Sequence, residues 1–364
     1  MRIHETPAVW SARQLAADGS WRIGIPPAQG RALRDLVKRQ ADRGLNLLDY
    51  RREDFPLGEL QGVLDRAMAM VRQGLGIALL KDLPAEGMSE DEYRLLTWAV
   101  GLNLGVAVPQ GKASHYISDV RDVGTVYKSR TGRGYSSNSA LDFHTDASDV
   151  VLLSCLRAAK EGGHSLVSSG VRVHNRLVET APELAAILYR DFWFSRQGEE
   201  APDEQPAYAI PVYGEKEGRL YMRHIRKNIT FAEGLPGVPP LRAEQTEALD
   251  AMDALAADPD FAHGLDLEPG DIQILNNYTA LHSRTEFRDH DAPERQRLLF
   301  RLWLAAPGFG TLPDGWERFY RTTAADAIRG GFRGQNYGPA CEAFERRQCA
   351  AVGMRFYDEV DAAA

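Results

Sequence analysis

The first third of the chain repeats apolar residues at helical spacing. Between residues 27 and 76, apolar positions recur three and four apart, which predicts amphipathic helices that bury one face. The short apolar run at residues 76–84 ends in a proline and predicts a buried strand. A further helix is expected to begin at Ser89, because Glu92 three residues later completes a capping box. We therefore expect a helical outer layer at about residues 27–104.

From about residue 105 the pattern changes to short apolar runs separated by glycine-bearing turns, which is typical of β-strands. Two helical stretches interrupt these runs, at about residues 176–189 and 243–256. The segments 198–218 and 231–241 are rich in proline, glycine and charge, and they are expected to form long loops. The clearest expected strands are residues 150–156, 164–170, 271–277 and 298–305.

These patterns together predict a mainly β core with flanking α-helices packed on it. The core would occupy about residues 105–305, and about residues 306–364 would form a C-terminal extension. No internal repeat or change of composition marks a linker, so one domain over residues 1–364 is the simplest organisation. The run RGGFRGQNYGP at residues 329–339 matches no catalytic pattern, and an oligomer contact or a cover over the core are its two open roles.

Composition narrows the kinds of partner. The chain is 44% hydrophobic and 26% charged, as expected for a folded globular protein. A formal net charge of -8 argues against a broad surface for nucleic acid or anionic membrane, so we expect a small-molecule partner and leave a homo-oligomer open. The three cysteines lack CxxC spacing, and neither a signal-like segment nor a run of about 18 apolar residues is found. We expect a cytoplasmic protein.

Candidate chemistry begins with His144 and Asp146 in the segment LDFHTDASD. Residues two apart on an extended strand project from the same face, so both side chains could reach one ion. With nine histidines and 51 acidic residues in the chain, about one such pair arises by chance. For the pair alone, a surface histidine and aspartate near a turn are therefore the more common outcome.

A third candidate ligand, His282, follows the apolar run DIQILNN and would complete a site of two histidines and one carboxylate. Such a triad leaves three adjacent positions open on iron(II). A zinc hydrolase can use the same residue types, so the triad alone does not choose the metal or the reaction. A cupin-type metal oxygenase or isomerase and a non-catalytic small-molecule binder also stay open at this point.

Arg297 favours one of these alternatives, because it opens the apolar run RLLFRLWLA that follows His282. Burying an unpaired guanidinium is costly, and its planar fork suits a carboxylate. A dicarboxylate that binds the metal at one end and Arg297 at the other would provide the partner that this arginine needs.

Four motifs, in this order, resemble the taurine dioxygenase-like (clavaminate synthase-like) family of iron(II)- and 2-oxoglutarate-dependent oxygenases. They are FHTD at 143–146, GGHSLVSSG at 162–170, the run NNYTALH that ends at His282, and RLLFRLWL from Arg297. The resemblance covers about residues 105–305 and implies a double-stranded β-helix, or jelly roll. It also implies iron(II) as cofactor, with 2-oxoglutarate and O2 as co-substrates.

The resemblance assigns roles to individual residues. Arg297 would hold the distal carboxylate of 2-oxoglutarate, and Ser165 stands where the family has an assisting hydroxyl, although His164 replaces the usual acidic neighbour. Asp146 favours hydroxylation over halogenation, because halogenating relatives lack this carboxylate. The expected reaction hydroxylates an unactivated C–H bond and releases succinate and CO2; desaturation and cyclisation stay open. The implied iron ligands are His144, Asp146 and His282.

The substrate is expected to be small and either anionic or amino-acid-like. In the basic segment at residues 219–229, Arg223 or Arg226 would anchor a carboxylate, sulfonate or phosphonate, unless the segment is only a solvated face. Arg301 matches a family position that can hold the anionic group of a substrate. The sequence leaves the substrate, the oxidised carbon and the oligomeric state open. Further candidates for substrate contact are His224, Lys227, Asn138, Tyr221 and Gln110.

Overall fold

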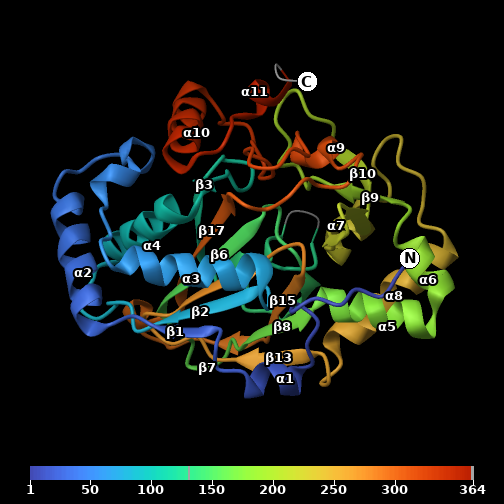
Figure 1. The fold of residues 1–364 in the computed structure, drawn as a ribbon, viewed down its shortest axis with the longest axis horizontal. Helices are drawn as coiled ribbons and strands as arrows, with labels where there is room; N and C mark the ends of the chain where they lie inside the picture. Colours follow the sequence, from blue (N-terminus) through green and yellow to red (C-terminus); the bar gives the residue numbers. More distant parts are fainter. Residues whose placement is uncertain (130–131, 362–364) are drawn as a thin grey trace.

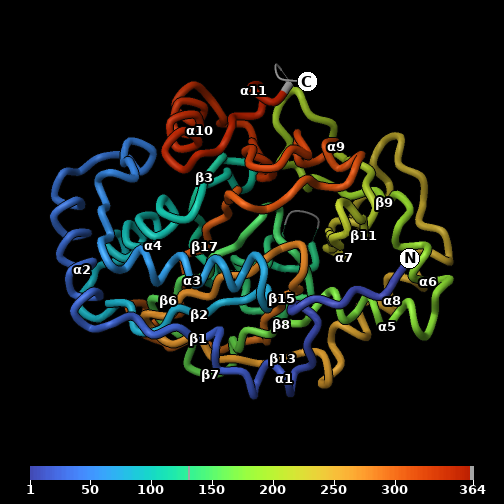
Figure 2. The backbone as a smooth tube through the Cα atoms, viewed as in Figure 1, coloured from blue at the N-terminus to red at the C-terminus, as the bar shows by residue number. Residues whose placement is uncertain are grey.

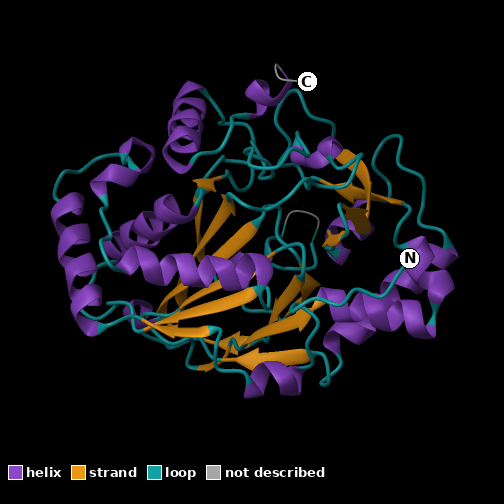
Figure 3. Ribbon diagram, viewed as in Figure 1, coloured by secondary structure: helices purple, strands orange, loops and turns teal. Residues whose placement is uncertain are grey.

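The computed structural model describes residues 1–129 and 132–361. Strands lie in the middle of the molecule, and helices surround them (Figure 3). The larger sheet has seven strands, six of which follow the order β1 (Arg22–Gly24), β2 (Ile77–Lys81), β14 (Ile272–Asn276), β6 (Val150–Arg157), β17 (Leu298–Ala305) and β3 (Val106–Ala107). The seventh strand, β4 (Ile117–Val120), also pairs with β17. Each of the four strands expected from the core pattern is present, three of them in this sheet.

The fourth expected strand belongs to a smaller, four-stranded sheet. Its order is β13 (Ala262–Leu265), β8 (Ser165–Ser169), β15 (Ala280–Arg284) and β5 (Leu141–His144). All of its pairings are antiparallel, and the pairing of β15 with β5 sets His282 directly opposite His144. Residues 138 positions apart in the sequence are therefore neighbours in the sheet.

Two-stranded sheets complete the β structure, and one of them corrects an expectation. The prediction of a loop throughout residues 198–218 is wrong from Ala207 onward, because β10 pairs there with β9 and buries Tyr208 and Ile210. Prolines at both ends of this short run, Pro206 and Pro211, concealed its alternation. These smaller pairs are β9 (Asp191–Ser195) with β10 (Ala207–Pro211), β11 (Tyr213–Lys216) with β12 (Arg219–Met222), and β7 (Glu161–Gly162) with β16 (Phe287–Arg288).

The expected helical layer is present on one side of the strands (Figure 1). It consists of α2 (Pro27–Ala41), α3 (Leu60–Gln73) and α4 (Glu90–Leu104), with α3 packed on β2 and β14 and α4 on β17. The capping box at the start of α4 is confirmed: Glu92 N donates to Ser89 Oγ at 3.1 Å, and Ser89 N donates to the Glu92 carboxylate at 2.7 Å. Short 3-10 helices lie at Leu47–Asp49, Arg52–Asp54, Gly134–Ser136 and Pro293–Arg295.

A second helical group lies on the other side (Figure 1) and covers the smaller sheet. The helix expected at 176–189 is instead two helices, because Pro182 lacks the N–H that a continuous helix needs and begins a new one. The N-terminal segment runs beside this group (Figure 2), where His4 N donates to Asn175 Oδ1 at 3.0 Å. The helices are α1 (Ala12–Ala17), α5 (Gly170–Thr180), α6 (Pro182–Ile187), α7 (Arg226–Ala232) and α8 (Ala243–Ala257).

The C-terminal extension is fastened to the core through a buried ion pair. Arg329 Nε lies 2.8 Å from Asp149 Oδ1, and both side chains are 1% exposed. The remaining Arg329 nitrogens donate to main-chain carbonyls, among them Phe309 O at 2.9 Å. Gly331 N donates to Ala147 O at 2.6 Å, so the extension reaches the loop that follows β5. Its helices are α9 (Glu317–Tyr320), α10 (Pro339–Val352) and α11 (Tyr357–Asp361).

One large cluster of buried hydrophobic side chains includes residues from Trp10 to Phe356 and takes in both larger sheets. The free thiols of the chain, Cys155, Cys341 and Cys349, are buried. Across the part of the chain that the structure describes, no helix combines the length and the apolar character that crossing a membrane requires.

Candidate active site

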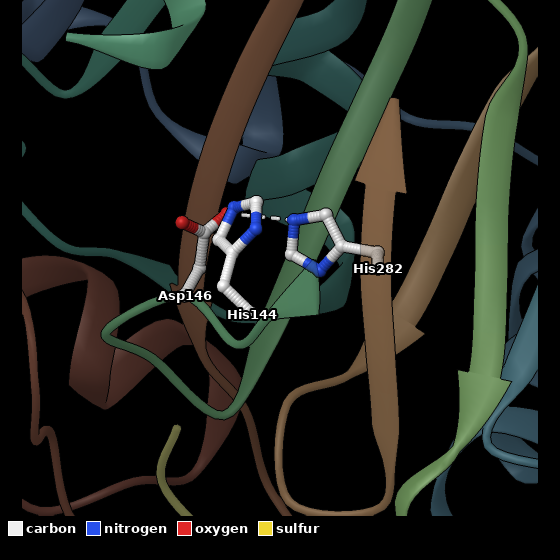
Figure 4. Close-up of side chains that lie close together, drawn as sticks. All are labelled: His144, Asp146 and His282. Carbon is white, nitrogen blue, oxygen red and sulfur yellow. Dashed lines mark ion pairs between the residues drawn. The ribbon is translucent and has the colours of Figure 1, made fainter. Parts of the chain in front are cut away.

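His144, Asp146 and His282 converge from two neighbouring strands of the smaller sheet (Figure 4). His144 ends β5, His282 lies opposite it on β15, and Asp146 follows in the loop before β6. One ligand atom from each residue lies within 4.8 Å of the other two, and Asp146 Oδ2 is 3.6 Å from His282 Nε2. Within residues 1–129 and 132–361, no other group of three histidine, cysteine or acidic side chains has this geometry.

The protonation states of these donors fit a divalent metal. Burial, together with the nearby His282 ring, lowers the pKa of His144 to about 3, so its imidazole is neutral at physiological pH. His144 Nδ1 lies 2.8 Å from the carbonyl of Asp142, which can only accept, so the lone pair is on Nε2. Asp146 Oδ2 is buried and has no hydrogen-bond partner within residues 1–129 and 132–361. Two imidazoles and a carboxylate with an unused oxygen suit iron(II).

The loop that carries Asp146 is held from several directions. Asn277 Oδ1 accepts a hydrogen bond from Asp146 N at 3.0 Å, and Arg223 Nη1 donates to Thr145 O at 2.6 Å. Gly331 of the C-terminal extension holds the next carbonyl, that of Ala147. Fixing the main chain on both sides of a ligand pre-organises its carboxylate for a metal.

A cavity opens beside the three residues. One wall is formed by alternate side chains of β17 and the residue before it, because successive strand residues face opposite sides of a sheet. At ~3.3 Å per residue, Arg297 and Arg301 on this wall are roughly 13 Å apart along the strand. The side chains of this wall are Arg297, Leu299, Arg301 and Trp303. The sequence-predicted arginines therefore line the same cavity as the triad.

Arg297 is buried at one end of this wall and has no acidic partner among the residues that the structure describes. Its guanidinium lies 5.0 Å from the ring centre of Phe287, and its one long hydrogen bond reaches Val120 O at 3.5 Å. The nearby Asp289 carboxylate accepts from the main-chain N–H of Arg297 at 2.7 Å instead. Burial lowers the pKa of the Arg297 guanidinium. A buried cation in this position calls for a ligand anion.

Arg284 is a second buried arginine at the same end, which the sequence interpretation missed. Its guanidinium also packs on Phe287, at 4.8 Å, and burial lowers its pKa to about 9. Nη2 donates to Ser137 O at 2.8 Å and to Ser139 O at 2.5 Å, whereas Nε and Nη1 have no partner among the described residues. The available signal was its spacing, since Arg284 is two residues after His282 and thus on the same face of β15.

Ser165 lines the cavity beside these arginines, opposite Arg284 in the pairing of β8 with β15. Its hydroxyl donates to Gln273 Oε1 at 2.9 Å. His164, one residue earlier, is exposed and pairs with Asp266 outside the cavity. The structure therefore brings Ser165 into the site and leaves His164 out of it.

The candidate substrate residues divide into two groups. Arg301 lines the cavity, with Nη1 3.4 Å from Asp146 Oδ1 and Nε donating to Gln110 Oε1 at 2.9 Å. Gln110 therefore meets the site through Arg301. Arg223 also borders the cavity, but its guanidinium is 1% exposed and lies 5.2 Å from the ring centre of Phe319.

The other candidates lie outside the cavity. Arg226 pairs with Asp250 at 2.6 Å and Asp253 at 3.1 Å, because α7 turns this side chain toward α8. His224 Nε2 lies 2.7 Å from the same Asp253. Tyr221 packs edge-on against the Tyr278 ring, and Asn138 is exposed. Lys227 is the exception among these candidates, because its ammonium borders the cavity and has no acidic partner in the described chain. A sequence pattern could not distinguish Lys227 from the candidates that lie outside.

Comparisons with known proteins agree with this geometry. The family model described as "Taurine catabolism dioxygenase TauD, TfdA family" matches residues 42–303. FR-33289 synthase from Streptomyces rubellomurinus is 32% identical over 304 residues, which cover 82% of this chain and 88% of that protein. The taurine hydroxylase-like protein SAT17 from Stachybotrys chartarum is 26% identical over 322 residues, which cover 82% of this chain and 81% of that protein.

Solved structures with the same fold include two amino-acid oxygenases. The crystal structure of asparagine oxygenase superposes with a TM-score of 0.62 at 17% identity, over 79% of this chain and 94% of that one. The non-heme iron oxygenase OrfP, in complex with iron and α-ketoglutaric acid, superposes with a TM-score of 0.56 at 17% identity, over 78% and 94% of the two chains. At these identities the likeness concerns the fold.

Proposed function

The chain belongs to the taurine catabolism dioxygenase TauD, TfdA family, and from this premise we propose that it hydroxylates a small anionic or amino-acid-like molecule. It is an iron(II)- and 2-oxoglutarate-dependent dioxygenase. The observation that carries the proposal is one cavity lined by a two-histidine, one-carboxylate group and by buried arginines without carboxylate partners in the described chain. This combination favours an enzyme over a non-catalytic binder.

In this proposal His144, Asp146 and His282 hold the iron. Bound iron(II) supplies, with 2-oxoglutarate and O2, the oxidising power to hydroxylate an unactivated C–H bond while succinate and CO2 are released. The protein contributes position and exclusion of water: the ligand loop is fixed by Asn277 and Gly331, and the cavity is closed in by buried apolar strand residues.

The arginine end of the cavity would receive 2-oxoglutarate. Arg297 would take the distal carboxylate, because a carboxylate matches its planar fork and supplies the charge that burial leaves unpaired. The Ser165 hydroxyl borders the same space, and Arg284 adds a second cation that also packs on the Phe287 ring. The two cations together favour a dianionic co-substrate over a neutral one.

The substrate class is supported by the cavity and by the named relatives. The cationic side chain of Arg301 faces the space beside the metal group, which favours an anionic group on the substrate. Complexes of asparagine oxygenase contain 3-hydroxyasparagine with succinate, and complexes of OrfP contain L-Arg and its hydroxylated forms. We carry hydroxylation of such a small molecule to this chain as part of the proposal.

We propose that the two larger sheets are the halves of a double-stranded β-helix, or jelly roll. In support, the iron ligands come from the smaller sheet and its loops, Arg297 and Arg301 come from the larger sheet, and all of them line one cavity. One hydrophobic cluster spans the chain, which fits a single domain at residues 1–364. The buried free thiols fit a reducing compartment, the cytoplasm.

Two measurements test the proposal. Anaerobic addition of iron(II) and 2-oxoglutarate to the apoprotein is expected to produce a visible charge-transfer band. In air, a panel of taurine, L-asparagine, L-arginine and aminoalkylphosphonates is then screened for substrate-dependent succinate release. A folded protein that gives no band contradicts the iron and 2-oxoglutarate assignment, whereas a band without succinate release from any anionic or amino-acid compound contradicts the substrate class.

A further inference from the structure

Lys227 lies at a part of the cavity that no assigned role uses. Its ammonium donates to Gly132 O and lies over the rings of Tyr127 and Phe231, at 4.9 and 5.5 Å from the ring centres. In the described chain no carboxylate lies within ion-pair distance of it. The preceding residue, Arg226, turns the other way and is neutralised by two aspartates on α8. The helix therefore presents one free cation to the cavity and one paired cation away from it.

Arg133 and Glu199 line the cavity beside Lys227 and neutralise each other. Arg133 Nη2 lies 2.8 Å from Glu199 Oε1, and the same guanidinium nitrogen donates to Gln197 O at 3.1 Å. Glu199 is 7% exposed, and it packs so closely on Gly111 that a Cβ there would lie 2.9 Å from its Oε1. Glu199 thus holds Arg133 in place, and the Lys227 charge stays unmatched.

The charges around the whole cavity also favour an anionic ligand. Six cationic side chains border it among the described residues, against the carboxylates of Asp146 and Glu199. In the proposed function Asp146 is committed to iron, and the two arginines on Phe287 are committed to 2-oxoglutarate. Glu199 is committed to Arg133. A partly buried cation without a counter-ion is unfavourable, so an anion that arrives with the substrate would be bound here.

We propose that Lys227, with Arg133 held by Glu199, binds the oxyanion headgroup of the primary substrate, whether carboxylate, sulfonate or phosphonate. The proposal rests on the proposed function, because it names the substrate end of that same site. Ile225, two residues before Lys227, forms a β-bridge with His144, the first of the three proposed iron ligands. The proposal therefore expects a short substrate, because its headgroup at Lys227 and its oxidised carbon at the iron would share one cavity.

The test uses three probes with the same propyl chain: propylphosphonate, propanesulfonate and butyrate. Each is titrated by calorimetry into anaerobic enzyme loaded with iron(II) and 2-oxoglutarate, for the wild type, Lys227→Met and the matched control Arg226→Met. The expected result is binding of at least one probe to the wild type and to Arg226→Met. Lys227→Met should weaken it by about 10- to 150-fold, the usual value of a charged hydrogen bond. Lys227→Arg, which keeps the charge, should restore most of the affinity.

Three results would overturn the proposal: no probe binds the wild type, Lys227→Met binds as tightly as Arg226→Met, or Lys227→Arg binds no better than Lys227→Met. The charge-transfer band of each loaded variant is recorded first. A band in the wild type without probe binding contradicts only the headgroup site, whereas the lack of a band contradicts the proposed function itself. The order of the three affinities identifies the headgroup, since the chain length is constant.

Discussion

Nη1 of Arg301 lies 3.4 Å from Oδ1 of Asp146, so an arginine of the cavity wall reaches a proposed iron ligand. Burial alone would raise the pKa of the Asp146 carboxyl, but Arg301 and the two histidines hold it well below its usual range. Oδ2, the other oxygen, faces His282 and has no hydrogen-bond partner in the described part of the chain. Arg301 therefore keeps the carboxylate ionised and turns its second oxygen toward the metal position.

From this relationship we predict that Asp146→Ala abolishes the iron-dependent charge-transfer band and lowers coupled turnover by more than about 100-fold, because loss of even an outer-sphere partner typically costs 10- to 100-fold. The measurement is anaerobic absorption with iron(II) and 2-oxoglutarate, followed by succinate release in air. Asp142→Ala is the matched control, since this carboxylate is exposed on β5, just before the loop of Asp146, and only its main-chain carbonyl contacts the His144 ring. Undiminished product formation by Asp146→Ala would exclude it as a ligand.

The sequence predicted those parts of the site that depend on local pattern. His144 and Asp146 share a strand-end motif, the helix cap at Ser89 is a three-residue signal, and the apolar runs of β6, β14 and β17 are long enough to be recognised. Arg297 was found because a cation in an apolar run has a known physical cost. Each of these inferences needed only residues that are neighbours in the chain.

The remaining features depend on contacts between distant segments. The pair of Arg329 with Asp149 joins residues 180 positions apart, and nothing in the run RGGFRGQNYGP announces it. Arg226 and Lys227 are adjacent and chemically alike, yet α8 supplies aspartates to one and not to the other. The missed strand β10 is recognised as a strand only through its antiparallel pairing with β9. Tertiary packing, which a local pattern does not contain, decided each case.

A second prediction concerns the two buried arginines. Arg297→Met and Arg284→Met should each weaken 2-oxoglutarate binding, because each removes a charged hydrogen bond of about 1.5–3 kcal/mol, or roughly 10- to 150-fold in the dissociation constant. Titration of the charge-transfer band with 2-oxoglutarate measures this constant directly. Arg295→Met, an exposed position two residues before Arg297, is the control. If Arg284→Met binds 2-oxoglutarate as tightly as Arg295→Met does, Arg284 does not bind the co-substrate and only donates to the carbonyls of Ser137 and Ser139.

A third prediction concerns the anchor of the C-terminal extension. Arg329→Met leaves the Asp149 carboxylate buried with 1% exposure and no charged partner, and breaking a buried pair in this way costs about 3–5 kcal/mol of unfolding free energy. Denaturant unfolding measures the loss. The double variant Asp149→Asn with Arg329→Met should lose less unfolding free energy than the sum of the losses of the two single variants, because it removes both charges. Strict additivity would show that the two side chains do not interact.

The last prediction follows from the charge of Lys227. Burial, and then the neighbouring Arg133, lower the pKa of this ammonium to about 8, while Glu199 and Asp142 only partly oppose them. Below that pH the ammonium is charged and available to an anion. Above it, binding an anion requires the uptake of one proton, so affinity should fall by about tenfold for each further pH unit.

Propanesulfonate suits this measurement, because its sulfonate stays ionised throughout and the titrating group must belong to the protein. Calorimetry between pH 6.5 and 9.5 should give a level affinity up to about pH 8 and a decline beyond it. Lys227→Arg should move the decline to higher pH, since a guanidinium keeps its proton to a higher pH than an ammonium does in the same surroundings. A wild-type profile that stays level to the highest pH, or an equal decline in Lys227→Arg, would assign the headgroup contact to the arginines of the cavity instead.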